Sequence, residues 1–139
     1  MKHFLRLSIF SLVIFGFSAF NLPAPGEPLA IHSAVPMPDY KMKDVSGNQI
    51  SLREAQKEKG LLVIFSCNTC PYVKLSATRI KEYSDYCLTN NIGCVLVNSN
   101  EEQRNEDDSF DEMVKYYKSQ NLKAYYTVDA NRSEERRVG

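Results

Sequence analysis

The sequence predicts one small α/β domain, in which helices pack against a sheet that contains parallel strands. The apolar run Leu61–Phe65 is typical of a strand buried on both faces, and it is expected at the centre of the sheet. A helical pattern continues to about residue 89, and a second apolar strand follows at residues 92–97. Strand, helix and strand in this order indicate a β-α-β unit with a right-handed crossover. The domain is expected to take up residues 31–130, with no second domain in this sequence.

A hairpin and a short helix are expected before the apolar strand. Residues 40–51 predict two short strands around a turn at 45–48, where Gly and Asn suit a tight reversal. Ser51 and Glu54 have the spacing of a capping box, so a helix is predicted to begin here. Gly60 is expected to mark its end.

Three further elements are predicted downstream. The helix after the apolar strand is expected to bury one face formed by Val73, Ala77, Ile80, Ser84 and Cys87. Ser109 and Glu112 have the spacing of a second capping box. The helix that they open is expected to bury Phe110, Met113, Val114 and Tyr117. Residues 124–128 predict the start of another strand.

The amino-terminal residues 1–22 predict a secretory signal peptide, followed by a linker at 23–30. Lys2 and Arg6 carry positive charge ahead of an apolar stretch at residues 7–20. That stretch is shorter than the about 20 apolar residues of a membrane span, and an uncleaved anchor stays open as the alternative. We therefore expect an exported protein, periplasmic or extracellular, that contacts a membrane only through an uncleaved leader.

The motif Cys67-Asn68-Thr69-Cys70 comes directly after the apolar strand and at the expected start of a helix. A helix amino terminus carries unpaired backbone N–H groups and partial positive charge, which favour a thiolate over a thiol. We expect Cys67 to attack a substrate and Cys70 to resolve the mixed disulfide. Pro71 is compatible with the first turn of a helix. The dipeptide between the cysteines sets no redox direction, so reductase and oxidase roles both stay open.

A C-x-x-C pair can also supply half of a zinc site, which would need two more ligands. His3 lies in the leader and His32 lies far upstream, while Cys87 and Cys94 fall on an apolar helix face and within an apolar strand. We therefore expect no metal and no cofactor. Cys87 and Cys94 are interpreted as small core residues, with a bridge between them as the alternative.

The remaining charged and aromatic residues indicate no further site. The chain has 17 basic and 17 acidic residues and no basic stripe, so nucleic acid is not expected as a partner. The acidic residues are interpreted as a solvated surface, and they are Glu101, Glu102, Glu106, Asp107, Asp108, Asp111 and Glu112. Packing explains the tyrosines Tyr116, Tyr117, Tyr125 and Tyr126.

Pro36-Met37-Pro38, the hairpin, the apolar strand and the string from Cys67 to Val73 together resemble the redoxin branch of the thioredoxin-like superfamily. That branch includes peroxiredoxin-like proteins (alkyl hydroperoxide reductase and thiol-specific antioxidant) and TlpA-like exported thioredoxins. The resemblance implies a thioredoxin-like three-layer α/β fold with a central mixed sheet. It also implies that Cys67 is the attacking cysteine and Cys70 the resolving one, with a protein thiol or disulfide, or a peroxide, as the reaction partner.

The sequence departs from this family in two places. Ile64 stands three residues before Cys67, where a peroxidatic cysteine has Thr or Ser, so thiol peroxidase chemistry is the weaker variant. The family fold also continues with a cis-proline loop, a hairpin and a final helix, whereas no proline follows Pro71. We expect a domain that is incomplete at its carboxyl terminus, with a non-native or disordered tail at residues 131–139. In that case the strand at 61–65 would become an open apolar edge.

The expected function is that of an exported thiol-disulfide oxidoreductase, an enzyme that works through its C-x-x-C dithiol. Two alternatives stay open. The first is a thiol peroxidase of the peroxiredoxin type, and the second is a non-catalytic, metal-carrying module built on the same fold.

Overall fold

The computed structural model describes residues 29–131. The predicted signal peptide, the linker up to residue 28 and the tail from residue 132 lie outside the described residues. Within the described part, no helix is long and apolar enough to cross a membrane.

Five strands form one mixed sheet in the order β2-β1-β5-β4-β3. The strands are β1 (Met42–Asp44), β2 (Gln49–Ile50), β3 (Leu61–Phe65), β4 (Gly93–Asn98) and β5 (Tyr125–Val128). Strand β4 pairs parallel with both β3 and β5, as the β-α-β pattern predicted. Strand β1 pairs antiparallel with β2, which confirms the hairpin, and antiparallel with β5.

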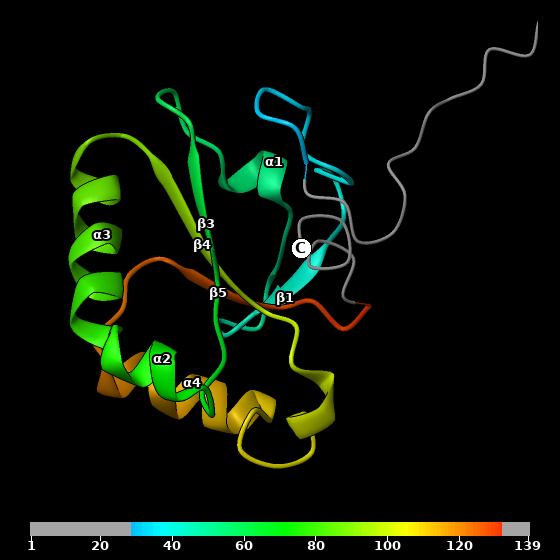
Figure 1. Cartoon of the computed structure of the whole chain (residues 1–139), viewed down its shortest axis with the longest axis vertical. Coiled ribbons are helices and arrows are strands. Elements are labelled where there is room, and N and C mark those ends of the chain that lie inside the picture. Colours follow the sequence, from blue (N-terminus) through cyan, green and yellow to red (C-terminus); the bar gives the residue numbers. More distant parts are fainter. Residues whose placement is uncertain (1–28, 132–139) are drawn as a thin grey trace, which may run out of the picture.

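Helices cover both faces of this sheet (Figure 1). They are α1 (Leu52–Ala55), α2 (Pro71–Leu75), α3 (Ala77–Thr89) and α4 (Phe110–Ser119), with a short 3-10 helix at Glu101–Gln103. Side chains alternate along β4, so Cys94 and Leu96 face α3 and α4 while Val95 and Val97 face α1. The result is the three-layer α/β fold that the resemblance implied.

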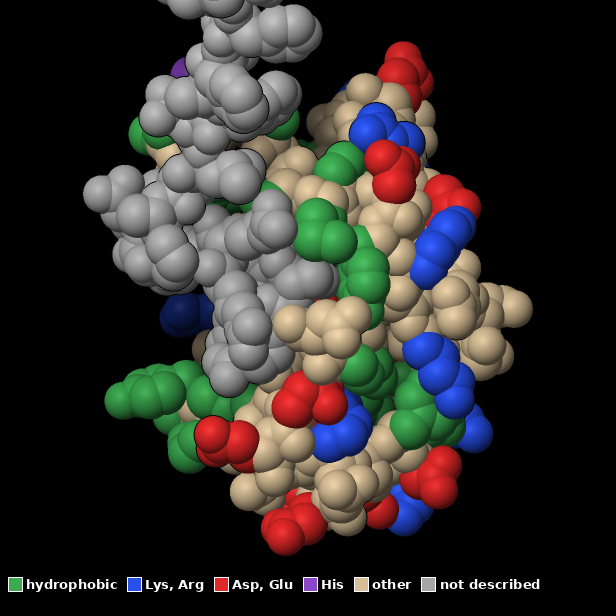
Figure 2. Space-filling view, turned by 90° about the vertical axis from the view of Figure 1, so that its right-hand side faces the viewer, with side chains coloured by type: hydrophobic (Ala, Val, Ile, Leu, Met, Phe, Trp, Pro, Cys, Tyr) green, Lys and Arg blue, Asp and Glu red, His purple; other side chains and the backbone are tan. Residues whose placement is uncertain are grey.

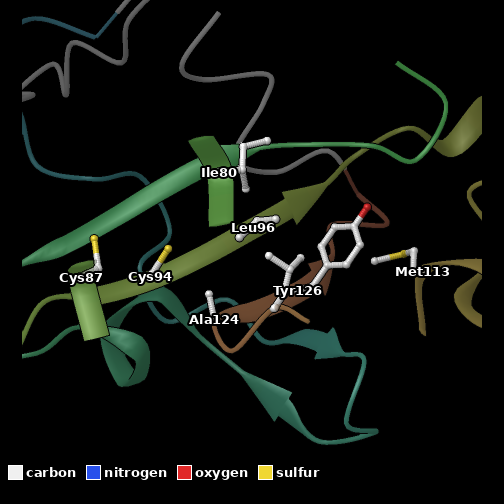
Figure 3. Close-up of a cluster of buried hydrophobic side chains, with 8 residues drawn as sticks. Ile80, Cys87, Cys94, Leu96, Met113, Ala124 and Tyr126 are labelled. Atoms are coloured by element: carbon white, nitrogen blue, oxygen red, sulfur yellow. The ribbon is translucent and has the colours of Figure 1, made fainter. Parts of the chain in front are cut away.

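The larger core lies between the sheet and the helices α3 and α4 (Figure 3). Its buried members are Ile80, Cys87, Cys94, Leu96, Met113, Leu122, Ala124 and Tyr126. Cys87 and Cys94 are buried free thiols. This confirms their interpretation as core residues, and the alternative of a disulfide between them is not observed. Burial raises the pKa of the Cys94 thiol to about 11, so this sulfur stays protonated at neutral pH.

The prediction that Leu61–Phe65 forms the centre of the sheet is wrong. Within residues 29–131, β3 borders the sheet, and the strand buried on both faces is β4. Leu62 and Ile64 pack on one core, and Leu61 and Val63 pack on the other. The apolar run therefore indicates that both faces of the strand are covered, but it does not predict whether the strand has a neighbour on each side.

Three predicted helix features also differ from the structure. Helix α1 has the capping box of Ser51 and Glu54, but it ends at Ala55. Gly60 instead adopts a φ of +117° in the turn that leads into β3. The single helix predicted after the C-x-x-C motif is divided by Ser76 into α2 and α3.

The prediction of a second capping box is also wrong. Ser109 caps α4 by position, but its side chain makes no capping hydrogen bond, and Glu112 forms an ion pair with Lys115 instead. Of the residues expected on the buried face of α4, Met113 is fully buried and the others are half-buried.

Figure 2 shows one face of the molecule in which Lys and Arg side chains are interspersed with Asp and Glu. No continuous basic stripe crosses the described side chains on this face. The surface charge thus has the mixed character expected from the equal numbers of acids and bases in the sequence.

Candidate active site

The C-x-x-C motif lies at the carboxyl end of β3, where the chain leaves the sheet and enters α2. The Ser66 N–H donates a 2.9 Å hydrogen bond to the Val97 carbonyl, which extends the pairing of β3 with β4 by one residue. Cys70 is the N-cap of α2, in an extended conformation, and Pro71 opens the helix as its sequence position predicted. The sheet thus positions one end of the motif and the helix positions the other.

The two sulfurs of the motif lie near different backbone N–H groups. The Cys70 N–H donates to Cys67 Sγ at 3.2 Å, and the Thr69 hydroxyl lies 3.7 Å from the same sulfur. The first-turn N–H groups of Val73 and Tyr72 lower the pKa of the Cys70 thiol and outweigh its partial burial. The helix-tip N–H groups were expected to act on Cys67, whereas those of Val73 and Tyr72 lower the pKa of Cys70.

Both cysteines are half-buried free thiols that face one cleft. The cleft has a volume of about 520 Å³, and its lining consists of Phe65, Ser66, Cys67, Thr69, Cys70, Pro71, Val73, Ser99, Asn100, Glu101 and Glu102. The buried Ser66 hydroxyl has no hydrogen-bond partner within the described part of the chain. A substrate in this cleft would therefore meet two sulfurs, several polar groups and an apolar wall.

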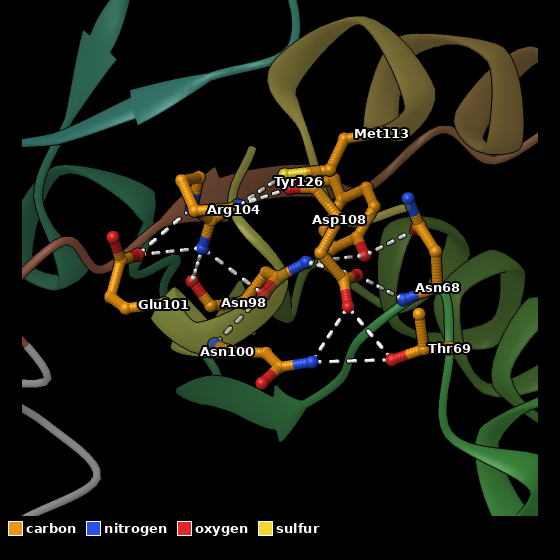
Figure 4. Close-up of polar contacts among 9 residues, drawn as sticks. All are labelled: Asn68, Thr69, Asn98, Asn100, Glu101, Arg104, Asp108, Met113 and Tyr126. Carbon is orange, nitrogen blue, oxygen red and sulfur yellow. Dashed lines mark hydrogen bonds and ion pairs between the residues drawn. The ribbon is translucent and has the colours of Figure 1, made fainter. Parts of the chain in front are cut away.

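A buried carboxylate, that of Asp108, lies behind the motif (Figure 4). Its Oδ1 accepts hydrogen bonds from the Asn68 backbone N–H at 2.5 Å and from Asn98 Nδ2 at 2.9 Å. Its Oδ2 accepts from Thr69 Oγ1 at 2.8 Å and from Asn100 Nδ2 at 2.7 Å. The interpretation of Asp108 as part of a solvated acidic surface is therefore wrong, because this side chain is fully buried.

The ionisation of Asp108 follows from these four donors. Burial by itself raises the pKa of this carboxyl group, since it disfavours the charged form. Hydrogen bonds from Asn68, Thr69, Asn98 and Asn100 outweigh burial and leave the pKa below its ordinary value. The site thus contains a carboxylate anion at neutral pH.

The Asn68 side chain makes a second set of contacts. Its Oδ1 accepts a 2.9 Å hydrogen bond from the Tyr126 hydroxyl, and its Nδ2 donates to the Asp107 carbonyl at 3.0 Å. Asn98 Nδ2 lies 3.3 Å from the same Tyr126 oxygen. Tyr126 is fully buried, as packing predicted, and burial raises its pKa, so its hydroxyl remains a donor.

Arg104 supports the segment that carries Asp108. Its guanidinium donates to the Asp108 carbonyl at 2.6 Å and to the Asn98 carbonyl at 3.0 Å, and it pairs with Glu101 at 2.8 Å. The Met113 sulfur lies 3.2 Å from the same group. The guanidinium thus contacts the main chain of Asp108, while the carboxylate itself faces neutral donors.

The sequence interpretation identified Cys67 and Cys70 but missed Asp108, Asn98 and Asn100 around them. One signal was available, because Asn98 and Asn100 are polar residues at the end of an otherwise apolar strand. Among residues 29–131, no group of three or more His, Cys, Asp or Glu side chains is arranged to hold a metal ion.

The chain is similar to a protein family and to several solved structures. The model of the Redoxin family matches residues 32–139. No curated protein sequence matches the chain. A hypothetical protein of Sinorhizobium meliloti has 25% sequence identity and a TM-score of 0.65, and the match covers 76% of this chain and 57% of that protein. The chain thus spans little more than half of this relative's length.

Two more distant structures share the fold. A secreted disulfide oxidoreductase of Mycobacterium tuberculosis, homologous to E. coli DsbE, has 14% identity and a TM-score of 0.53, with 67% of this chain and 62% of that one covered. The bacterioferritin comigratory protein of Xanthomonas campestris, described for its alkyl peroxide reduction activity, has 14% identity and a TM-score of 0.55, with 72% and 59% covered.

Proposed function

This chain belongs to the Redoxin family of thioredoxin-like proteins, whose chemistry is thiol-based, and we propose that it is an exported thiol-disulfide oxidoreductase acting through Cys67 and Cys70. The observation that carries the proposal is the 3.2 Å contact between the Cys70 N–H and Cys67 Sγ, at a cleft that both cysteines line. Two thiols three positions apart, held at the end of a strand, suit the formation and opening of an internal disulfide.

In the reducing direction, the Cys67 thiolate attacks one sulfur of a substrate disulfide. An S–S bond forms between Cys67 and the substrate, and the other substrate sulfur leaves as a thiolate. Cys70 then attacks Cys67 Sγ, closes the internal disulfide and releases the second substrate thiolate. The N–H groups of Val73 and Tyr72 favour the Cys70 thiolate, which suits this cysteine to the second step.

Reduction of insulin by dithiothreitol tests this function. We expect the full chain to accelerate it, and Cys67→Ser and Cys70→Ser each to abolish the acceleration. Cys87→Ala is the matched control, because it removes a thiol that is buried away from the cleft. A Cys67→Ser variant as active as the wild type would reject the proposal.

Export is the second part of the proposal, and its support is the charged and apolar pattern of residues 1–22. Expression of the full chain in a bacterium, followed by fractionation and mass measurement of the mature amino terminus, tests it. Retention of the whole protein in the cytoplasm with its leader intact would contradict export.

A thiol peroxidase function is the second candidate, and it is favoured by the hydroxyl groups near Cys67. Thr69 Oγ1 lies 3.7 Å from the sulfur, and the Ser66 hydroxyl, which has no hydrogen-bond partner among residues 29–131, belongs to a residue that lines the same cleft. Attack of the Cys67 thiolate on a peroxide would give a sulfenate and one alcohol or water, and condensation with Cys70 would then release water. Trapping of a Cys67 sulfenic acid in a Cys70→Ser variant by dimedone separates this function from disulfide exchange.

A further inference from the structure

The carboxylate of Asp108 connects the dithiol loop to a segment that lies 40 positions away in the sequence. We propose that Asp108 is a positioning residue, whose buried carboxylate holds the Asn68 backbone and the Thr69 hydroxyl so that Cys67 and Cys70 close readily into an internal disulfide. This inference rests on the proposed function, because it concerns the same pair of cysteines.

The hydrogen-bond geometry at this position requires a carboxylate. Each of its two oxygens accepts two donors, one from the dithiol loop and one from Asn98 or Asn100. A carboxylate accepts at both oxygens, whereas an amide of the same shape has one acceptor oxygen and one donor nitrogen. Asp108→Asn would therefore turn an NH₂ group toward donors that now find an acceptor.

The same contacts connect the loop to the sheet. Asn98 is the last residue of β4, the most deeply buried strand, and Asn100 lies two residues beyond it, just before the 3-10 helix at Glu101–Gln103. Arg104 holds the main chain of Asp108 from the opposite side through its 2.6 Å bond to the carbonyl oxygen. The carboxylate is thus fixed to rigid structure on one side and to residues between the two cysteines on the other (Figure 4).

The negative charge of Asp108 acts in the same direction as its hydrogen bonds. Ionisable groups near this carboxylate include Cys70, the hydroxyl of Tyr126 and the guanidinium of Arg104, which points to the main chain. The thiol of Cys67 lies on the other side of the Thr69 hydroxyl, which contacts both the sulfur and the carboxylate. The charge raises the pKa of Cys70 against the lowering effect of the helix N–H groups, and so it disfavours the thiolate form of Cys70. Loss of the carboxylate would loosen the loop and stabilise the reduced pair, and both effects oppose the disulfide.

Equilibration of the full chain with glutathione buffers measures this effect. One glutathione disulfide and the Cys67–Cys70 dithiol give the internal disulfide and two molecules of glutathione, so the equilibrium constant reports how readily the pair closes. We expect Asp108→Asn to lower this constant about tenfold, which corresponds to about 30 mV for a two-electron couple. The matched control is Asp107→Asn, which removes the same charge from an exposed neighbour and is expected to leave the constant unchanged.

Thr69→Val is the second variant, and it protects the test against misfolding of Asp108→Asn. It removes one of the four donors to Asp108, together with the longer 3.7 Å contact of the hydroxyl to Cys67 Sγ, and it places no amide in the buried site. We expect roughly a threefold decrease in the same constant. Thermal unfolding is recorded for all variants, because a merely structural role would lower the melting temperature and leave the glutathione equilibrium unchanged.

The outcomes separate the two proposals. If the wild-type protein forms no internal disulfide, the proposed function fails. If it does, and Asp108→Asn matches Asp107→Asn while Thr69→Val matches the wild type, the positioning role of Asp108 is overturned alone. If Asp108→Asn does not fold, an unchanged equilibrium constant in Thr69→Val overturns it.

Discussion

The Tyr126 hydroxyl donates a 2.9 Å hydrogen bond to the side-chain oxygen of Asn68, which stands between the two cysteines of the motif. Tyr126 belongs to β5, at the middle of the sheet, and is fully buried. A core aromatic residue therefore holds the side chain of Asn68, while Asp108 holds its backbone N–H. The loop is thus connected to the core through side chains as well as through its own backbone.

Tyr126→Phe tests the contribution of this hydroxyl to stability. The variant keeps the ring and removes the donor, so Asn68 Oδ1 loses its partner, and we expect a loss of about 1 to 2 kcal/mol in the free energy of unfolding. Denaturant titration measures it. Tyr125→Phe is the control, because that side chain is 41% exposed, and equal effects of the two variants would contradict the prediction.

Asp108 is expected to make stability depend on pH in the acid range. Its pKa in the folded protein lies below the ordinary value of 3.8, so its contribution is present above pH 3.8 and is lost as the pH falls through the folded value. The stability difference between the wild type and Asp108→Asn should therefore shrink with falling pH. Denaturant titrations at a series of pH values check this. A difference that stays constant into the acid range would exclude it.

Cys94 is expected to have the opposite dependence at alkaline pH. Burial raises its pKa from 9.0 to about 11, so the folded form holds the proton that the unfolded chain releases. Its contribution to stability is complete below pH 9.0 and is lost as the pH rises towards 11. The buried tyrosines titrate in the wild type and in Cys94→Ala alike. The wild type should therefore lose more stability than Cys94→Ala over this interval, and parallel curves would refute the expectation.

Gly93 is expected to be more sensitive to substitution than Gly47. A Cβ at this position would lie 2.1 Å from the Ala55 carbonyl oxygen, because α1 packs directly on the start of β4. We expect Gly93→Ala to lower the free energy of unfolding by about 3 kcal/mol. Gly47→Ala is the comparison, since its Cβ meets open space and only the φ of +90° costs about 1 to 2 kcal/mol. Unfolding titrations that show Gly47→Ala to be the more damaging change would reject this reasoning.

Local patterns were sufficient for much of the fold. The hairpin turn, the capping box of Ser51 and Glu54, and the apolar strands each depend on neighbouring residues, and the structure contains all of them. The motif at Cys67 and Cys70 was found for the same reason, because its spacing and its place between a strand and a helix are visible in the chain. Its chemistry remains a prediction that the experiments above test.

Tertiary structure decided which strand lies at the border of the sheet and which side chains meet around the thiols. The continuous apolar run Leu61–Phe65 indicates that both faces of this strand are covered, but the order of the strands depends on pairing between distant segments. The side chains of Asp108, Asn98 and Tyr126 come from a loop and two strands, and an acid in an acidic stretch has the same local pattern whether it is solvated or buried. These groups meet Asn68 and Thr69 only in the folded protein. Hydrogen bonds between segments that are far apart in the chain produce no local sequence pattern from which they could be predicted.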